Sequence, residues 1–325
     1  MKETIAYLNS LLKDNDTVII GLSGGPDSMC LLNILLSLKK DLKIICAHIN
    51  HNIRKESIEE LEFIENYCKE KNIILETTTF DKKSSETDYN ELELREKRYT
   101  YFKEIINKYK AQYLFTAHHG DDLIETILMR LTRGSNLKGY SGFQVETNKN
   151  NYKIIKPLIF MTKEEINSYN KENNIPFVID KTNEEDNYTR NRYRHHILPF
   201  LKSENKNVHL KYLKFSKELQ SYYEFVDKTV KQEIDKRYIK NILDIEDFER
   251  LDALIQTRVI EYILDQQYVD NLYLVSDRHI NLILDIIKNT ESNSNYYIRL
   301  NSKEITLPLY VRTRKEGDKM FVKNM

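Results

Sequence analysis

Residues 18–28 of the chain read VIIGLSGGPDS, an apolar strand that runs into a Ser-Gly-Gly-x-Asp-Ser turn. The apolar segment from Met29 to Leu38 follows at once and predicts a helix. Gly24 and Gly25 can adopt positive φ and bring backbone N–H groups close to an anion, and the start of the helix adds its positive dipole end. The stretch therefore predicts a strand, a loop and a helix that together bind phosphate.

The loop differs from the G-x-x-x-x-G-K-[ST] loop of kinases, because no lysine follows its glycines to reach the β- and γ-phosphates. A plain Gly-rich turn is the alternative, and the match at five chemically distinctive positions argues against it. The pattern from Ser23 to Ser28 resembles the loop of the ATP pyrophosphatases. This resemblance implies adenylation, in which pyrophosphate leaves and AMP is transferred to a carbonyl or amide oxygen.

Strand and helix patterns alternate after this unit. Strands are predicted at residues 17–21, 43–49, 73–78 and 113–117, and helices at 57–71, 90–109 and 121–132. The alternation predicts an α/β fold with a doubly wound parallel sheet, whose ligands lie beyond the carboxyl ends of the strands. Residues 154–159 and 177–179 are expected to add a strand or close the sheet, with a helix over 163–173 between them.

The second half of the chain has a different pattern. Apolar residues recur every three or four positions from Val208 to Val230 and predict one long amphipathic helix. Further helical segments at 245–264 and 277–287 predict a smaller all-α domain. Residues 307–318 predict a short C-terminal β segment.

Composition excludes several classes of protein. No apolar run of the 325 residues approaches the roughly 20 that a membrane span needs, and the N-terminus lacks the features of a signal peptide, so we expect a cytoplasmic protein without membrane contact. Cys30, Cys46 and Cys68 form no C-x-x-C pair and are interpreted as reduced core residues.

The 50 basic residues balance the 50 acidic ones, but residues 190–220 hold eight Lys or Arg and two acids. That local excess favours contact with an anion such as RNA over a merely solvated helix face.

Acidic residues gather at the start of the predicted helix at 121–132. Asp121 is interpreted either as a helix cap or as a site residue. Asp122 and Glu125 lie one turn apart and, with Asp27, place carboxylates at one crevice. They could hold Mg²⁺ against ATP oxygens, neutralise a cationic amine, or accept the proton of an amine nucleophile. Zinc is disfavoured, because no further His or Cys stands at ligand spacing from the adjacent His118 and His119.

Taken together, several segments resemble the tRNA(Ile)-lysidine synthetase family of PP-loop ATP pyrophosphatases. The matching segments are Ser23 to Ser28, His48-x-x-His51-x-x-Arg54, Glu91 to Tyr99, His118 to Thr126, Arg133 to Phe143, Asp180-x-x-Asn183, Arg190 to Pro199, and Val311 to Asp318. The chain departs from the family pattern at Asn52 and Asn136, where Gly is usual, and at Lys156, where Arg is usual.

The resemblance implies a fold similar to that of the adenine nucleotide alpha hydrolases. It also implies that the chain divides into three parts. These are a catalytic PP-loop domain at 1–204, a helical tRNA-contacting domain at 205–300, and the start of a truncated or missing C-terminal domain at 301–325. The implied activity is a ligase that uses ATP and Mg²⁺ to join free L-lysine to the wobble cytidine of tRNA(Ile) with a CAU anticodon. A homodimer is compatible with this assignment.

The site residues that follow fall into three groups. Asp27, Asp122 and Glu125 are the expected catalytic residues, and Asp27 is also the expected Mg²⁺ ligand. The expected ATP-binding residues are Ser23, Gly24, Gly25, Pro26, Asp27, Ser28, His48 and Arg54. The expected tRNA-binding residues are Arg95, Arg98, Arg133, Lys138, Arg190, Arg192 and Arg194.

Two other functions stay open from the sequence. A PP-loop tRNA thiolase would share the loop but needs a sulfur source or an iron–sulfur cluster, and the scattered cysteines argue against it. A non-catalytic RNA-binding relative would retain a relic loop, which the intact Ser23, Asp27, Asp122 and Glu125 disfavour. A measurement of ATP turnover distinguishes the non-catalytic RNA-binding relative from the ligase and the thiolase.

Overall fold

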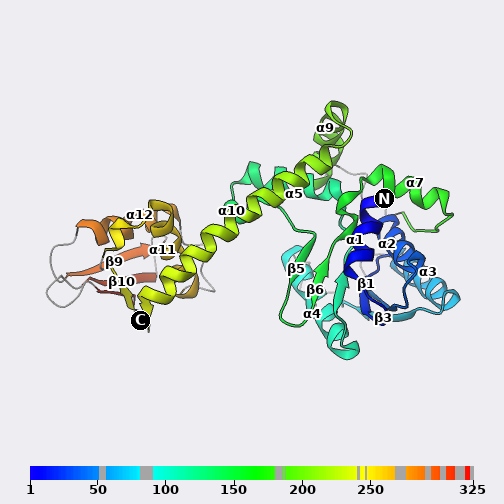
Figure 1. Ribbon diagram of the computed structural model, residues 1–325, viewed down its shortest axis with the longest axis horizontal. Coiled ribbons are helices and arrows are strands. Elements are labelled where there is room, and N and C mark those ends of the chain that lie inside the picture. The colour runs from blue at the N-terminus through cyan, green and yellow to red at the C-terminus, as the bar shows by residue number, and fades with distance from the viewer. Residues whose placement is uncertain are drawn as a thin grey trace. The chain divides into compact units, whose positions relative to one another are not determined.

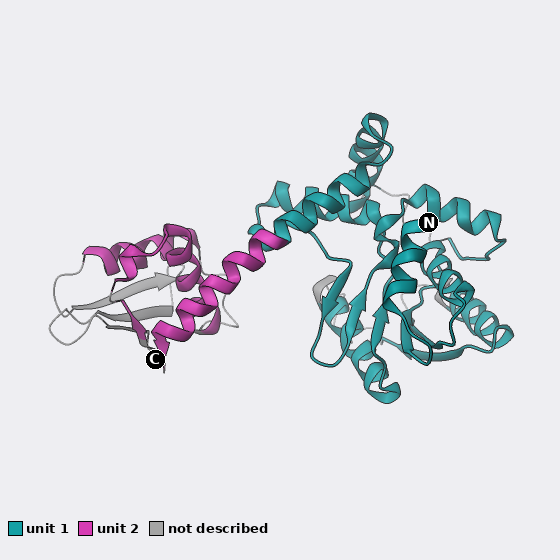
Figure 2. Ribbon diagram, in the orientation of Figure 1, with its two compact units in different colours: residues 1–220 teal, residues 221–325 magenta. Residues whose placement is uncertain are grey.

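The computed structural model shows two compact units, residues 1–220 and 221–325 (Figure 2). It describes residues 1–50, 56–80, 91–179, 186, 188–239, 242–245, 247–267, 276–289, 294–300, 305–311 and 319–322. The boundary at 220 replaces the one expected at 204, because the first half of helix α10 (Val208–Arg237) packs within the first unit. Leu213 of α10 lies in a core cluster with Leu123, and the Ser216 hydroxyl donates to the carbonyl of Ser141 at 2.5 Å.

A six-stranded sheet with the order β3-β2-β1-β4-β6-β5 forms the centre of the first unit (Figure 1). Its strands are β1 (Thr17–Gly21), β2 (Lys43–Asn50), β3 (Ile74–Thr79), β4 (Tyr113–Phe115), β5 (Glu146–Asn148) and β6 (Lys153–Ile155). All neighbours pair in parallel except β5 and β6. The order reverses between β1 and β4, which is where a doubly wound sheet opens a ligand crevice. The predicted parallel α/β sheet is confirmed.

Helices cover this sheet (Figure 1). The first seven are α1 (Lys2–Leu11), α2 (Pro26–Ser37), α3 (Glu56–Glu70), α4 (Glu91–Tyr109), α5 (Gly120–Arg133), α6 (Leu137–Tyr140) and α7 (Lys163–Glu172). They are followed by α8 (Thr189–Arg192), the π-helical turn η3 (Tyr193–Ile197) and α9 (Leu198–Glu204). The predicted helices after the first three strands lie within one to three residues of α2, α3 and α4.

Strand β1 shows why the sheet is buried on both faces. Val18 and Ile20 point into a core cluster with Leu31 of α2 and Ile166 of α7, whereas Ile19 points into a cluster with Phe102 of α4. Successive side chains of a strand point to opposite faces, so an unbroken apolar run requires helices on both sides.

The expectation that residues 154–159 add a strand is confirmed in part, and the same expectation for residues 177–179 is wrong. The segment at 154–159 is strand β6 followed by the 3-10 helix η1 (Pro157–Phe160), because Pro157 has no N–H to continue a strand ladder. Residues 177–179 form no strand. The N–H of Val178 donates to the carbonyl of Gly24 at 3.0 Å, so this segment lies against the Gly-rich loop instead of extending the sheet.

The second unit contains the expected helices and a larger sheet than expected. Its elements after α10 are β7 (Tyr238–Ile239), β8 (Ile242–Asp244), the 3-10 helix η4 (Phe248–Arg250), α11 (Ala253–Gln267), α12 (Asp277–Asn289), β9 (Ser294–Leu300), β10 (Ile305–Val311) and β11 (Lys319–Val322). The helix expected at 245–264 is interrupted at Asp252, whose carboxylate accepts the N–H of Leu254 at 2.8 Å and starts α11.

The strands of the second unit form an antiparallel sheet in the order β7-β8-β11-β10-β9. Strands β10 and β11, which belong to the part expected at 301–325, pair with β9 and β8 of the part expected at 205–300. Pairing between β8 and β11, which lie far apart in the chain, leaves no local signal in the sequence. Among the helices of the described ranges, none is long and apolar enough to cross a membrane.

Candidate active site

The Gly-rich loop lies at the carboxyl end of β1, beside the point where the strand order reverses. Gly24 has φ +79°, a conformation that suits glycine. The Ser28 hydroxyl donates to the carbonyl of Gly25 at 3.0 Å and accepts the N–H of Ser23 at 3.2 Å. Pro26 occupies the first turn of α2, where its missing N–H costs nothing. These contacts fix the backbone of the loop at the start of helix α2, which is the placement that the sequence predicts for it.

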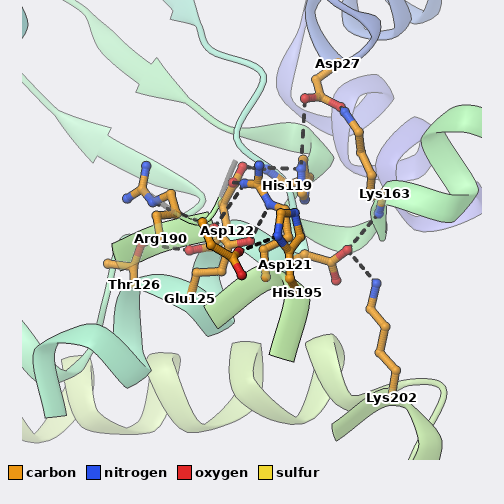
Figure 3. A network of polar contacts seen from close by, with 12 residues as sticks. Asp27, His119, Asp121, Asp122, Glu125, Thr126, Lys163, Arg190, His195 and Lys202 are labelled. Atoms are coloured by element: carbon orange, nitrogen blue, oxygen red, sulfur yellow. Dashed lines mark hydrogen bonds and ion pairs between the residues drawn. The ribbon is translucent and has the colours of Figure 1, made fainter. Parts of the chain in front are cut away.

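Asp27 lies beside this loop, between the side chains of Lys163 and His119 (Figure 3). Its carboxylate forms an ion pair with Lys163 at the start of α7, and the imidazole Nε2 of His119 lies 4.0 Å from its other oxygen. The Asp27 side chain is 31% exposed. The expected catalytic aspartate is therefore accessible and already paired with a cation from another part of the chain.

Asp121 links α5 to α7 and α9. One of its carboxylate oxygens accepts hydrogen bonds from the backbone N–H of Lys163 at 2.9 Å and from the Lys202 ammonium at 2.6 Å. Asp122, in contrast, accepts the N–H of His119, the residue that precedes α5, at 3.0 Å. Of the two acids, Asp122 provides the cap of α5, and Asp121 positions the start of α7.

Asp122 and Glu125 share the guanidinium of Arg194. Arg194 donates to both oxygens of Glu125, at 2.8 and 3.1 Å, and lies 3.5 Å from Asp122. Arg190 Nε lies 3.7 Å from Glu125. The Glu125 side chain is 1% exposed and that of Asp122 is 15% exposed, so Asp122 is the carboxylate that solvent or a ligand reaches.

The two carboxyl groups differ in acidity. Burial raises the pKa of Glu125, and the charge of Asp122 adds to this rise while Arg194 opposes it. Burial also raises the pKa of Asp122, but the positive fields of His119 and His118 and the hydrogen bond from the His119 N–H outweigh it and bring the pKa to about 2. At neutral pH Asp122 is a permanent anion, whereas Glu125 is the more basic of the pair.

His48 lies beneath the Gly-rich loop. It is buried, its Nδ1 is 2.9 Å from the carbonyl of Leu22, and burial lowers its pKa. A neutral imidazole that donates from Nδ1 leaves Nε2 as an acceptor, and within the described residues this atom has no hydrogen-bond partner. An unpartnered buried acceptor beside the loop fits an expected ATP-binding residue. Arg54, another expected ATP-binding residue, lies outside the described residues, as do His51, Asp180, Asn183 and the segment 312–318.

The expected tRNA-binding residues separate into two sets. Arg95, Arg98, Arg133, Lys138, Arg190 and Arg192 are exposed. Arg194 is instead held by Glu125 and Asp122, so its guanidinium is a structural part of the crevice. The interpretation of residues 190–194 as a single cationic face therefore does not extend to Arg194.

The sequence analysis did not identify Lys163 and Lys202 as site residues, and it did not predict that Lys156 is buried. A signal for Lys163 exists, because Thr162 and Glu165 form a capping box that starts α7 at this residue, after strand β6 and the 3-10 helix η1. Lys156 is buried with its ammonium 5.7 Å from the centre of the Phe143 ring, and burial together with Arg95 lowers its pKa to about 8. No local pattern predicts the burial of a lysine.

Residues 1–201 match the PP-loop domain family, which is more than half of the chain. The chain belongs to the PP-loop domain family. It is 38% identical over 298 residues to the tRNA(Ile)-lysidine synthase of Bacillus cereus, a match that covers 87% of this chain and 62% of that protein. The tRNA(Ile)-lysidine synthase of Bacillus subtilis is 36% identical over 301 residues, with coverage of 89% and 64%. The chain thus spans less than two thirds of the length of these relatives.

A solved structure shares the fold at low identity. It is the U34-tRNA thiolase NcsA from Methanococcus maripaludis with its [4Fe-4S] cluster, which is 18% identical with a TM-score of 0.57. The similarity covers 67% of this chain and 78% of that one. At this identity the likeness concerns the fold alone.

Proposed function

We propose that this chain catalyses the ATP-dependent ligation of lysine to C2 of the wobble cytidine of tRNA(Ile) with a CAU anticodon. The observation that carries the proposal is the placement of Asp122 and Glu125 at the same sheet edge as the Gly-rich loop. One part of the crevice suits pyrophosphate, and the other suits a cationic amine. The identity to the lysidine synthases of Bacillus supports this substrate pair.

The first step is adenylation. The O2 atom of cytosine attacks the α-phosphorus of ATP, the bond between the α-phosphorus and the bridging oxygen breaks, and pyrophosphate leaves. The Ser23 to Ser28 loop would hold the departing phosphates with backbone N–H groups and hydroxyls. The base must leave the anticodon stack to reach the loop, which costs a few kcal/mol, and less in a loop that is already single-stranded.

Asp27 would hold Mg²⁺ against the ATP oxygens. A Mg²⁺ ion in nucleotide sites is bound by one or two carboxylates and the substrate phosphates, and one accessible carboxylate beside a phosphate loop fits that pattern. The described residues contain no group of three or more ligating side chains, so a metal cage made only of protein is not the arrangement proposed. The ion would neutralise charge on the leaving pyrophosphate.

The second step is amine transfer. The amine of lysine attacks C2, the bond between C2 and O2 breaks, and AMP leaves with the oxygen. Asp122 stays ionised and would bind the ammonium of lysine. Glu125 would add negative charge behind Asp122, and one of the two carboxylates would receive the proton that the amine must lose to become a nucleophile.

The cysteines disfavour the thiolase alternative. Cys30, Cys46 and Cys68 are the three cysteines of the chain, and all are buried in the apolar core that packs on the sheet. A cluster ligand must reach the crevice, and buried apolar thiols are inert. The non-catalytic alternative requires that ATP is not turned over.

The test combines the protein with ATP, Mg²⁺, labelled lysine and transcribed tRNA(Ile) bearing a CAU anticodon. We expect label in the RNA and one pyrophosphate per lysine transferred. A tRNA with a CAU anticodon that accepts methionine is the matched control. Pyrophosphate release without transfer of lysine would contradict the ligase and favour another adenylating enzyme, and absence of ATP turnover would favour the RNA-binding relative.

A further inference from the structure

A lysine from a distant part of the chain, Lys163, lies beside the Gly-rich loop. Lys163 lies 136 residues from Asp27 in the chain, and its ammonium contacts the Asp27 carboxylate (Figure 3). In kinase-type loops a lysine within the loop reaches the β- and γ-phosphates, and here the corresponding position lacks one. The fold thus brings a cation to the place where the loop sequence has none.

Several contacts hold Lys163 at this place. Thr162 and Glu165 form a capping box that fixes the start of α7, and Asp121 accepts the backbone N–H of Lys163 at 2.9 Å. Further along α7, the Asn170 amide donates to the carbonyl of Pro26 at 2.9 Å. The backbone of Lys163 is thereby tied to α5, and α7 is tied to the loop.

The side chain of Lys163 has more freedom than its backbone. The side chains of Lys163 and Asp27 are 36% and 31% exposed, so water screens their ion pair and the contact costs little to exchange. His119 Nε2 lies 4.0 Å from the second oxygen of Asp27 and remains beside it if Lys163 moves. A flexible four-carbon stem with three donors suits a group of phosphate oxygens.

We propose that Lys163 binds the β- and γ-phosphates of ATP and pairs with Asp27 when the nucleotide is absent. With ATP bound, the ammonium of Lys163 would exchange the Asp27 carboxylate for phosphate oxygens, and Asp27 would be left to hold Mg²⁺. The positive charge then faces the pyrophosphate as it leaves. This proposal rests on the proposed use of ATP at the loop and is independent of lysine and tRNA.

The test measures binding of ATP, inorganic pyrophosphate and AMP to the full chain by calorimetry with Mg²⁺, without tRNA or lysine. Because a hydrogen bond to a charged group is strong, Lys163→Ala should weaken the binding of ATP and of pyrophosphate about 10- to 100-fold. The affinity for AMP, which lacks both phosphates, should change less than about twofold. Lys163→Arg keeps the charge and should retain most of the ATP affinity.

Two controls make the result specific. Lys171→Ala removes an exposed lysine from the other end of the same helix and should leave all three affinities unchanged. Asp27→Asn combined with Lys163→Ala, measured without Mg²⁺, tests whether Lys163 only neutralises Asp27, because in that case removal of both charges restores the ATP affinity that the parent chain has without Mg²⁺. We expect no such recovery.

The outcomes separate this proposal from the ligase. Parental ATP affinity in Lys163→Ala, an equal loss for ATP and AMP, or recovery in the double variant would overturn the role of Lys163 alone. Suppose that Lys163→Ala selectively loses binding of ATP and pyrophosphate, and that the parent chain fails to transfer lysine to tRNA. That result would support the role of Lys163 and overturn the ligase. A parent chain that binds no ATP would overturn both.

Discussion

Arg194 and Glu125 form a bidentate ion pair 69 residues apart in the chain, with the guanidinium donating to both carboxylate oxygens at 2.8 and 3.1 Å. Glu125 is 1% exposed, so this pair supplies the compensation that a buried carboxylate requires. The π-helical turn η3 carries Arg194, and α5 carries Glu125. The pair therefore joins the basic segment after residue 188 to the acidic helix of the crevice.

Replacement of Arg194 by Ala should lower the free energy of unfolding. The buried Glu125 would lose its two charged donors, which costs about 1–3 kcal/mol for an unsatisfied buried group. Urea unfolding at pH 7 measures the effect. Arg192→Ala, an exposed arginine two residues away, should change stability by less than about 0.5 kcal/mol. Equal stability of the two variants would show that Glu125 does not depend on Arg194.

The stability of the first unit should fall in acid through Asp122. Its pKa of about 2 lies below the value of an unfolded aspartate, near 3.9, so the stabilisation is complete above about pH 4 and is lost as the pH falls towards 2. The shift corresponds to about 2 kcal/mol. Asp122→Asn should flatten the curve of unfolding free energy against pH in this window. A slope equal to that of the parent chain would assign the acid sensitivity to other carboxylates.

The same substitution should separate the two chemical steps. An amide at position 122 can hydrogen-bond but cannot neutralise an ammonium, so we expect lysine transfer to fall more than adenylation does. Adenylated RNA and lysidine are measured separately by mass spectrometry of the digested tRNA. Equal loss of both products would place Asp122 at the ATP or metal site.

Asp27→Ala should abolish release of pyrophosphate and leave the protein folded. Asp27 is partly exposed and its main contact is the screened pair with Lys163, so little stability depends on it. Release is followed with a coupled pyrophosphate assay, and thermal unfolding reports the fold. Normal release by the folded variant would remove Asp27 from the reaction.

Arg190→Ala combined with Arg192→Ala should weaken tRNA binding and reduce its dependence on salt. Each lost phosphate contact lowers the slope of log K against log salt by roughly 0.7 to 0.9. Arg194 stays in place because it donates two hydrogen bonds to the buried Glu125, whereas Arg190 lies 3.7 Å from that carboxylate. Fluorescence anisotropy over a salt series gives both values, with Lys171→Ala as the control. If the double variant binds tRNA with the affinity and salt slope of the parent chain, the tRNA-binding residues must be sought at Arg133, Lys138 and the exposed face of α4.

The strand, loop and helix from Thr17 to Ser37 could be predicted from the sequence because their determinants are local. The apolar run of β1, the glycines of the turn and the proline in the first turn of α2 act within a few residues of one another. The expected placement of Asp27 and Asp122 at one sheet edge followed from the rule that carboxyl ends of parallel strands meet.

Only the tertiary structure decided which side chains pair across that edge. The ion pair between Lys163 and Asp27 and the one between Arg194 and Glu125 depend on how α7 and η3 pack against α2 and α5. The pairing of β11 with β8 in the second unit depends on strands that are distant in the chain. Periodicity and capping report what a residue does within its own helix or strand, whereas these contacts are set by packing and strand order, which no local pattern contains.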